Sequence, residues 1–323
     1  MSFVRTILGD IDAREMGVCY AHEHIVIDAS YPTEKEPDFL LADVDRIAAE
    51  LRDLHMAGVR AVIDSMPGGG AGRNALKLAE ISRRSGLHIV CPTGLHLAKY
   101  YPPGHWGQRL DEQELTAVFV GEIGQGIDGN DLAGPEVRRT PHRAGLIKIA
   151  GGRDRLTEPE LRLFCAAAAA HVATGCPILT HTEEGTAALE QVEVLRDAGA
   201  DLRHVVLSHL DRRPDLTYHR EILSTGVRLE YDSAFRWKPG QGNPTLDLVV
   251  ALIGDFPDQI LLGMDAARSR YWASFGGAPG LAFLLRDFVP QLRAADLSRR
   301  DVDRILIDNP AAAYSFAAIR STP

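Results

Sequence analysis

The stretch Val18-Cys19-Tyr20-Ala21-His22-Glu23-His24 joins an apolar, strand-like run to a pair of histidines. Side chains two residues apart in a strand point to the same face, so both imidazoles share one face and Glu23 takes the other. By itself an H-x-H pair is a weak signal in a chain with 12 histidines. Its meaning depends on the runs that follow it along the chain.

Eight short apolar runs have the length and composition of strands. They are Val18–His24, Val59–Asp64, His88–Thr93, Gly145–Ile149, Pro177–His181, Val205–His209, Arg228–Asp232 and Ile260–Asp265. Amphipathic segments with helical spacing lie between them, among them Val44–Ala57, Ala75–Ser85, Glu158–Thr174, Ala187–Ala198 and Pro244–Ile253. Alternating strands and helices predict parallel strands joined by right-handed crossovers. An open, doubly wound sheet has the same periodicity as a closed barrel.

The position of the polar residues favours the barrel. Six of the eight runs carry, toward the carboxyl end, a side chain that could bind a metal or titrate: His22 and His24, Lys148, His181, His209, Asp232 and Asp265. Only a barrel brings so many strand ends to one point. We therefore expect an α/β fold, a single (β/α)8 TIM barrel over residues 1–323. Residues 96–110 and 125–143 are expected to form long loops over its mouth.

Composition excludes several classes of protein. Apolar residues make up 45% of the 323 residues, and no run reaches the ~20 apolar residues that span a bilayer. The first residues show no secretory signal, so a cytoplasmic location is expected. The net charge of −9 argues against nucleic acid and anionic membranes as partners. Four scattered cysteines without a C-x-x-C pair argue against disulfides and a thiolate zinc site.

A metal centre is the simplest explanation of the polar strand ends. His181 and His209 each end an apolar run, and Asp265 ends another. Imidazoles and carboxylates together suit Zn²⁺, Mn²⁺ or Fe²⁺. Lys148 is unusual, because an ammonium inside a barrel strand is costly to bury. An ion pair with an unseen carboxylate is the ordinary explanation for such a lysine.

The whole pattern resembles the phosphotriesterase family of the amidohydrolase superfamily, which includes lactonases. The likeness runs from residues 17–24 to Asp308-Asn309-Pro310. It implies that CO₂ carboxylates Lys148, and that the resulting carbamate bridges two divalent cations, with Zn²⁺ the first choice and Mn²⁺, Co²⁺ or Fe²⁺ as alternatives. It places His22, His24 and Asp265 on the more buried cation, and His181 and His209 on the other. It also implies a homodimer.

In this resemblance Asp265 is the catalytic residue. A water shared by two cations has a lowered pKa and becomes a hydroxide nucleophile near neutral pH. Asp265 would then act as the proton shuttle to the leaving oxygen. The nearest rival is a one-metal deaminase of the same superfamily. A barrel that binds metal or ligand without turnover belongs to a different functional class.

The loops after the last two runs indicate the substrate. Lys238 follows the seventh run, and Arg268 and Tyr271 follow the eighth, in the region where barrels often bind phosphate. These three side chains resemble the phosphate clamp of a family branch that opens phosphorylated sugar lactones, although Arg236 or Arg270 could serve instead. A lactonase acting on aldono-1,4-lactone phosphates is therefore the first expectation. A phosphotriesterase, an N-acyl homoserine lactonase or another lactonase is the alternative.

The loop after the third run departs from the family pattern. Many relatives have an aromatic residue after the Thr-Gly pair, whereas this chain continues with Leu95 and His96. His96, Lys99, Tyr100 and Tyr101 could each take the place of that aromatic residue, and His96 and Tyr100 are the candidate substrate-binding residues. His96 is equally well explained as a plain loop residue. The glycine-rich segment 68–73 lacks the Gly-Lys-Ser/Thr ending of a nucleotide loop.

Overall fold

The computed structural model describes residues 2–134, 136–238, 240 and 242–319. Its strands are β1 (Phe3–Thr6), β2 (Gly9–Asp12), β3 (Cys19–Glu23), β4 (Ala61–Asp64), β5 (His88–Val90), β6 (Pro92–Gly94), β7 (Leu146–Gly151), β8 (Ile178–Thr182), β9 (Val205–Ser208), β10 (Arg228–Tyr231) and β11 (Ile260–Leu262). Its α-helices are α1 (Tyr31–Lys35), α2 (Val44–Met56), α3 (Ala75–Ser85), α4 (Glu112–Gly124), α5 (Glu158–Thr174), α6 (Ala188–Asp197), α7 (Leu216–Ser224), α8 (Pro244–Leu252), α9 (Val289–Ala294), α10 (Arg299–Asp303) and α11 (Asn309–Tyr314).

Shorter helical segments connect these elements. The 3₁₀ turns are η1 (Ala13–Glu15), η2 (Pro37–Phe39), η3 (Ala98–Tyr100), η4 (Trp106–Gln108), η5 (Glu183–Gly185), η6 (Leu202–His204), η7 (Leu210–Arg212), η8 (Ser269–Tyr271) and η9 (Ala273–Phe275). The π-helical segments are η10 (Leu284–Phe288) and η11 (Arg304–Asp308). Two of these turns, η5 and η7, come within two residues of the ends of β8 and β9 and therefore shape the mouth of the barrel.

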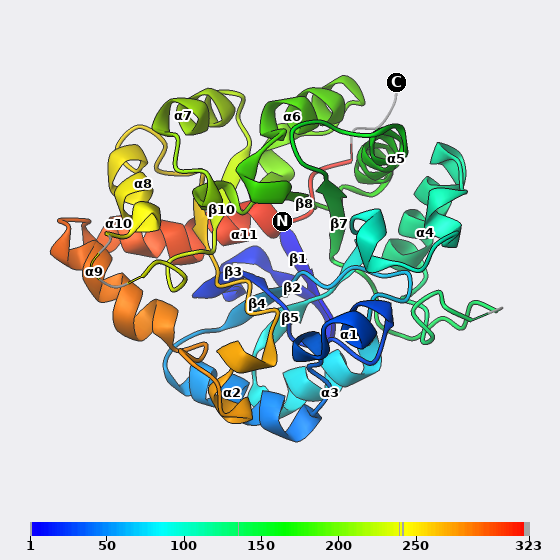
Figure 1. The fold of residues 1–323 in the computed structure, drawn as a ribbon, viewed down its shortest axis with the longest axis horizontal. Coiled ribbons are helices and arrows are strands. Elements are labelled where there is room, and N and C mark those ends of the chain that lie inside the picture. The colour runs from blue at the N-terminus through cyan, green and yellow to red at the C-terminus, as the bar shows by residue number, and fades with distance from the viewer. Residues whose placement is uncertain (1, 135, 239, 241, 320–323) are drawn as a thin grey trace.

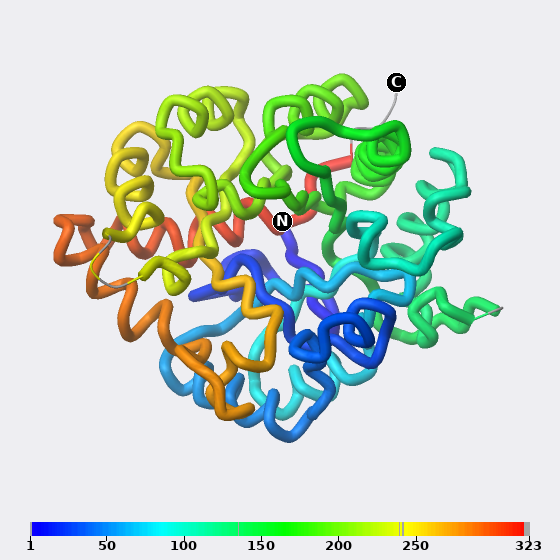
Figure 2. Tube along the Cα trace, viewed as in Figure 1, coloured from blue at the N-terminus to red at the C-terminus, as the bar shows by residue number. Residues whose placement is uncertain are grey.

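Strands β3 to β11 form a parallel barrel surrounded by helices (Figure 1). β5 and β6 are halves of one strand interrupted at Cys91, whose carbonyl accepts a hydrogen bond from the Gly145 amide at 2.9 Å. The ring closes where the amides of Met264 and Asp265 donate to the His22 carbonyl at 3.2 and 2.9 Å. In Figure 2 the trace accordingly runs once around the ring and returns to its start. The predicted TIM barrel is confirmed.

Each predicted run overlaps a barrel strand, and the five named helices begin and end within one residue of their expected bounds. The prediction was wrong at the end of the eighth run, which was expected to reach Asp265 but ends at Leu262. The physical reason is the barrel closure itself, since two successive amides turn toward the carbonyl of His22. Asp265 then adopts a left-handed φ of 47°, which is not a strand conformation.

Local signals explain where the helices begin and end. The Asn74 side chain accepts a hydrogen bond from the Lys77 amide at 3.0 Å and caps the start of α3. Gly86, with φ of 80°, ends the same helix in the left-handed conformation that suits glycine. Thr157 and Glu160 form a reciprocal capping box at the start of α5. These helices therefore have fixed starting points before they pack on the barrel.

The hydrophobic core lies between the barrel and its helices. The inner face of α2 buries Ile47, Leu51 and Leu54, and the inner face of α3 buries Leu78 and Ile81. Such one-sided burial is typical of surface helices on a globular core. Among the described residues, no helix combines the length and the apolar character needed to cross a membrane.

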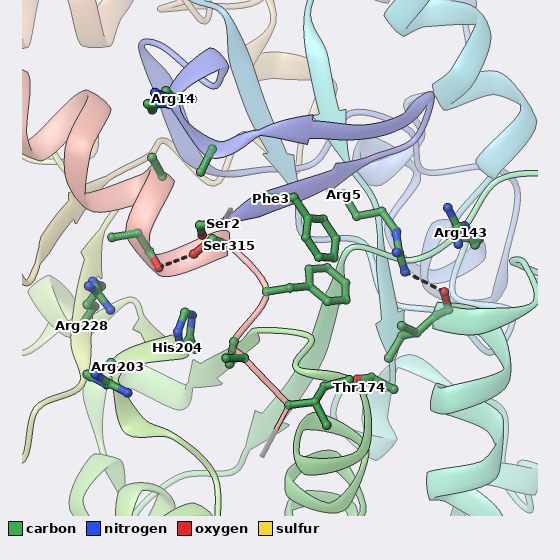
Figure 3. A pocket seen from close by; sticks show the side chains of 18 of the residues that line it. Ser2, Phe3, Arg5, Arg14, Arg143, Thr174, Arg203, His204, Arg228 and Ser315 are labelled. Carbon is green, nitrogen blue, oxygen red and sulfur yellow. Dashed lines mark hydrogen bonds between the residues drawn. The ribbon is translucent and has the colours of Figure 1, made fainter. Parts of the chain in front are cut away.

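The amino-terminal end of the barrel is covered by an antiparallel hairpin of β1 and β2, which the sequence analysis did not anticipate. Phe3 in this hairpin stacks on Phe316 with 4.6 Å between ring centroids. A cavity of about 1320 Å³ lies here, and Figure 3 shows Arg5 and Arg143 on one side of it and Arg203, His204 and Arg228 on the other. This is the end of the barrel opposite to the predicted metal ligands.

Candidate metal centre at the carboxyl end of the barrel

The H-x-H pair lies on β3 and directly after it. His22 is 1% exposed and His24 is 9% exposed, with 5.7 Å between their ring centroids. Glu23 points away from both imidazoles, as strand alternation predicts, and its carboxylate accepts hydrogen bonds from the amides of Met264 and Ala266 at 2.9 and 3.3 Å. Glu23 therefore holds the chain that follows β11 in place.

Asp265 meets both imidazoles of the pair. Its Oδ1 lies 3.3 Å from the Nε2 of His24 and 3.7 Å from the Nε2 of His22. The ligand atoms of these three residues lie within 4.8 Å of one another, as a metal ion requires. The positive φ of Asp265 turns its side chain toward the histidines, and non-glycine residues in this conformation concentrate at functional sites.

His181 lies on β8, one residue before its end, and His209 directly follows β9; the structure brings both to the same place. Their ring centroids lie 4.6 Å apart, and the ring of His209 lies 4.8 Å from that of His22. His209 also has a left-handed φ of 68°. Burial lowers the pKa of His181 to about 4, and burial also lowers the pKa of His22 and His209. All three rings are therefore neutral near pH 7, which is the form that binds metal.

Carboxylates stand behind two of the imidazoles. Glu183 Oε2 lies 2.7 Å from the Nε2 of His181, and Asp232 accepts a hydrogen bond from the Nδ1 of His209. A carboxylate partner fixes the proton on the nitrogen that it faces and leaves the other nitrogen as a ligand. His181 is thus prepared to bind a cation through Nδ1, and His209 through Nε2.

Lys148 lies on β7 and is 1% exposed. Its Nζ and both ring nitrogens of His22 have no hydrogen-bond partner among the described residues. Burial lowers the pKa of Lys148 to about 8, against the opposing charge of Asp265. Unpartnered buried nitrogens are costly unless something binds them. The donor set and these orphaned nitrogens therefore fit a cation site.

Two arginines that the sequence analysis did not place in the metal centre contact Asp265. The Nη2 of Arg212 donates to Asp265 Oδ2 at 2.7 Å, and the Nη2 of Arg236 donates to the same oxygen at 3.0 Å. Arg212 lies in η7, three residues after His209, and that spacing is the only sequence signal that could have found it. From the sequence, Arg236 was predicted only as an alternative phosphate-binding residue.

These contacts set the charge of Asp265. Burial alone would raise its pKa, but Arg236, His24, His209 and Arg212 together hold it well below its usual range. Asp265 is therefore a carboxylate across the whole neutral range, able to ligate a cation or accept a proton.

A cavity of about 460 Å³ opens above this cluster. Its polar lining includes five of the six predicted metal ligands, namely His22, His24, His181, His209 and Asp265. Its apolar wall comes from Ile27, Pro32, Met66 and Pro67. The metal cluster is thus the floor of a pocket large enough for a small organic substrate.

Arg268 and Tyr271, two of the predicted substrate-binding residues, line this cavity. Arg268 pairs with Glu36 at 2.6 Å and lies over the ring of Phe39, 4.2 Å from its centroid. Arg270, which also lines the cavity, pairs with Asp38 at 2.6 Å. Acidic residues on the loop after β3 therefore hold both arginines at the rim.

His96 and Tyr100 also line the cavity. Their rings meet edge to face at 4.5 Å, and the ring of His96 lies 4.8 Å from that of His181. The Leu97 amide donates to the Nδ1 of His96 at 2.8 Å, so its Nε2 remains available. The structure thus brings His96 close to the predicted cation ligands.

Lys238 is not brought to the cavity. Its side chain is exposed, and it is not among the described residues that line the pocket. Arg236, two residues earlier, contacts Asp265 instead. The predicted three-residue clamp is therefore represented in the cavity by Arg268 and Tyr271.

A search against protein-family models matches residues 2–314 to the phosphotriesterase family. The chain belongs to this family. Membership confirms the predicted family and the enzyme class, a hydrolase, that the sequence indicated. Among curated relatives, a phospho-furanose lactonase of Mycoplasmopsis agalactiae is 32% identical, with 97% of this chain and 92% of that protein aligned. A phosphotriesterase homology protein of Escherichia coli is 34% identical over 91% of this chain and 97% of its own length.

Solved structures agree with this family over almost the whole chain. A crystal structure of an amidohydrolase from Mycoplasma synoviae superposes with a TM-score of 0.93 at 30% identity, covering 99% of this chain and 93% of that one. A lactonase from Listeria monocytogenes gives a TM-score of 0.89 at 29% identity, covering 98% of this chain and 100% of its own.

Proposed function

We propose that this protein is a metal-dependent lactonase that opens phosphorylated sugar (aldono-1,4-) lactones. One observation carries the proposal: the candidate cation ligands and a rim of arginines line the same cavity of about 460 Å³. The floor of the cavity would supply hydrolytic chemistry, and the rim would supply a site for an anion. The names of the lactonase relatives support the same substrate class.

Two divalent cations fit the residues at the floor. His22, His24 and Asp265 would hold one, and His181 and His209 the other, as the family resemblance implies. When bound, such cations polarise an ester carbonyl and lower the pKa of water. Zn²⁺ suits this ligand set, and Mn²⁺, Co²⁺ and Fe²⁺ accept it too.

Lys148 would hold both cations as a carbamate. With its pKa lowered to about 8, a useful fraction of its Nζ is the free amine at neutral pH. The amine forms a bond to the carbon of CO₂ and releases a proton, so that a carboxylate replaces the ammonium. This change converts a buried cation that repels metal ions into an anion that attracts them. Metal loading should therefore depend on added bicarbonate.

Asp265 is the residue placed to move the proton. During hydrolysis a water oxygen bonds to the lactone carbonyl carbon, the ring C–O bond breaks, and a proton must reach the leaving ring oxygen. Asp265 is ionised and lies at the cavity floor, so it can accept the proton of the attacking water and pass it on. Arg212 and Arg236 keep its carboxylate oriented through their hydrogen bonds.

The rim would recognise the phosphate. Arg268 would offer a guanidinium fork, and Tyr271, which lines the same cavity, would offer a neutral hydroxyl. The bound phosphate would orient the carbonyl over the floor, so its binding energy contributes to the rate. A neutral phosphotriester gains nothing from such a rim. For this reason the phosphotriesterase alternative is less well supported than a lactonase.

A proton-release assay tests the proposal. The metal-loaded protein would be offered a panel of aldono-1,4-lactones with and without a phosphate, an N-acyl homoserine lactone and a neutral phosphotriester. We expect turnover to be fastest for a phosphorylated lactone. Equal rates with and without the phosphate would refute the role of the rim. Metal uptake without turnover of any compound would identify a binding protein instead.

Other expectations from the sequence stay predictions. A single folding domain should unfold in one calorimetric transition, and a homodimer should appear in sedimentation equilibrium. The cytoplasmic location can be checked by cell fractionation.

A further inference from the structure

Two buried carboxyl groups lie beneath the candidate metal centre. Glu230 is on β10 and Asp232 follows that strand, so the two side chains point to the same face, into the barrel. Both residues are fully buried. Their ligand atoms and those of His22 and His209 all lie within 4.8 Å of one another. The predicted ligand set did not include either carboxyl group.

Glu230 faces the back of His22. Its Oε2 lies 3.2 Å from the Nδ1 of His22, and neither of its oxygens has a hydrogen-bond partner among the described residues. Space for the group is provided by Gly263, where a Cβ would lie 2.7 Å from Oε1 of Glu230. A side chain at position 263 would therefore displace this carboxyl group.

Asp232 faces the back of His209 in the same way. It accepts a hydrogen bond from the Nδ1 of that ring, and the Nη2 of Arg212 lies 3.3 Å from its Oδ1. The two carboxyl groups thus contact two imidazoles, and in the proposed centre these two imidazoles would bind different cations. Each contact is made through Nδ1.

A further cation between these four groups is a poor explanation. The Nε2 of His22 faces Asp265, at 3.7 Å, whereas its Nδ1 faces Glu230. A cation on each nitrogen of one ring would require loss of the second imidazole proton. A hydrogen bond from Nδ1–H to a carboxyl oxygen requires no such loss, and it leaves Nε2 as the ligand.

We propose that Glu230 and Asp232 are positioning residues that fix His22 and His209 in the form with the proton on Nδ1. The Nε2 of His22 is then free to bind one cation, and the Nε2 of His209 is free to bind the other. This inference rests on the proposed metal-dependent function. The pair supports both halves of the centre at once. Loss of the Glu230 contact should therefore weaken metal binding although Glu230 touches no substrate.

The test compares Glu230→Met with Glu230→Gln. Methionine has a similar length but lacks an acceptor, whereas glutamine keeps an oxygen that can accept from Nδ1–H. Competition with a chromogenic chelator would give the Zn²⁺ affinity, and the visible spectrum of the Co²⁺ form would report the ligand geometry. We expect about 10- to 100-fold weaker binding and an altered spectrum for Glu230→Met. Glu230→Gln should stay within about threefold of the parent protein.

Asp211→Asn is the matched control. The Asp211 carboxylate is also buried beside β10, but it accepts from the Ser233 amide and the Thr245 hydroxyl rather than from an imidazole. Its replacement should leave metal affinity unchanged. Circular dichroism and thermal unfolding of the metal-free variants would confirm that each is folded; an unfolded Glu230→Met would be replaced by Glu230→Leu.

Three results would overturn the inference. They are parental affinity in Glu230→Met, equal losses in Glu230→Met and Glu230→Gln, and a third cation per chain that disappears with either variant. Because these readouts do not require turnover, they are separate from the proposed activity. A parent protein that binds two cations but hydrolyses no lactone would refute the function and leave the positioning role intact.

Discussion

The two ends of the barrel differ in how their polar groups are satisfied. The larger cavity, about 1320 Å³, lies at the amino-terminal end (Figure 3), and the cavity at the carboxyl end is about 460 Å³. In the larger one, Arg5 pairs with Asp10 at 2.7 Å, and Arg203 pairs with Asp201 at 2.6 Å. Most of its charges are therefore neutralised locally.

The smaller cavity differs at its floor, although the arginines at its rim are also paired with acidic residues. The nitrogens of His22 and Lys148 lack partners among the described residues, and His209 and Asp265 hold strained left-handed backbones. A folded protein retains strained backbones and unpartnered buried groups mainly where binding of a ligand offsets their unfavourable free energy. Unpartnered nitrogens and strained backbones gathered in one cluster of possible metal ligands therefore distinguish the carboxyl end of the barrel, whereas cavity size does not.

The largest expected effect comes from Asp265. Asp265→Asn keeps the size of the side chain but weakens both cation binding and proton transfer. We expect kcat/KM on the best lactone to fall about 10³-fold or more. Steady-state proton release at equal metal content would measure it. Arg5→Met at the other end should keep parental kcat/KM, and a comparable loss there would break the contrast between the two ends.

A smaller effect is expected at the rim of the functional cavity. Arg268→Met should raise KM for the phosphorylated lactone about 10- to 100-fold, because a charge-assisted contact is lost, and should leave the unphosphorylated lactone unaffected. Lys238→Met should change KM less than about threefold, since exposed charges contribute little. A larger effect of Lys238→Met would restore Lys238 to the phosphate clamp.

The pH dependence of the free energy of unfolding should also differ between the parent protein and the His181→Gln variant. His181 has a pKa of about 4 in the folded protein and about 6.5 when unfolded, so the unfolded chain binds more protons between these values. The free energy of unfolding of the metal-free protein should therefore fall as pH is lowered from about 6.5 to about 4, by about 3 kcal/mol from this group. Urea titrations would show it. His181→Gln should flatten the slope, and an unchanged slope would contradict the assignment.

The smallest effects are expected at the amino-terminal end. Arg5→Met should lower the free energy of unfolding by about 2 kcal/mol, because it removes contacts to Asp10 and to the Ile123 carbonyl. Arg228 is the exception there, since its Nε and Nη1 are buried without a partner among the described residues, and burial lowers its pKa. Arg228→Met should therefore be neutral or stabilising. Denaturant unfolding of both variants, with kcat as a control, tests this ordering.

Local spacing was enough to predict most of the candidate site. His22 and His24 were assigned to one face because strand geometry repeats every two residues, and the structure places them so. Arg212 escaped prediction because its role depends on a turn after β9 and on Asp265, which comes from a different strand. Lys238 has the expected residue type, but its side chain is exposed and does not line the cavity.

The sequence by itself determined the alternation of strands and helices, the helix caps and the order of polar groups at strand ends. These depend on neighbours a few residues apart, where backbone geometry fixes which side chains share a face. Tertiary structure alone decided that Glu230 lies behind His22 and that Gly263 leaves room for it. Tertiary structure also formed the hydrogen bond from the Met264 amide to the Glu23 carboxylate, which are 241 residues apart in the chain. Such contacts depend on how the barrel closes, because residues far apart in the chain become neighbours only through the register of its last strand against its first.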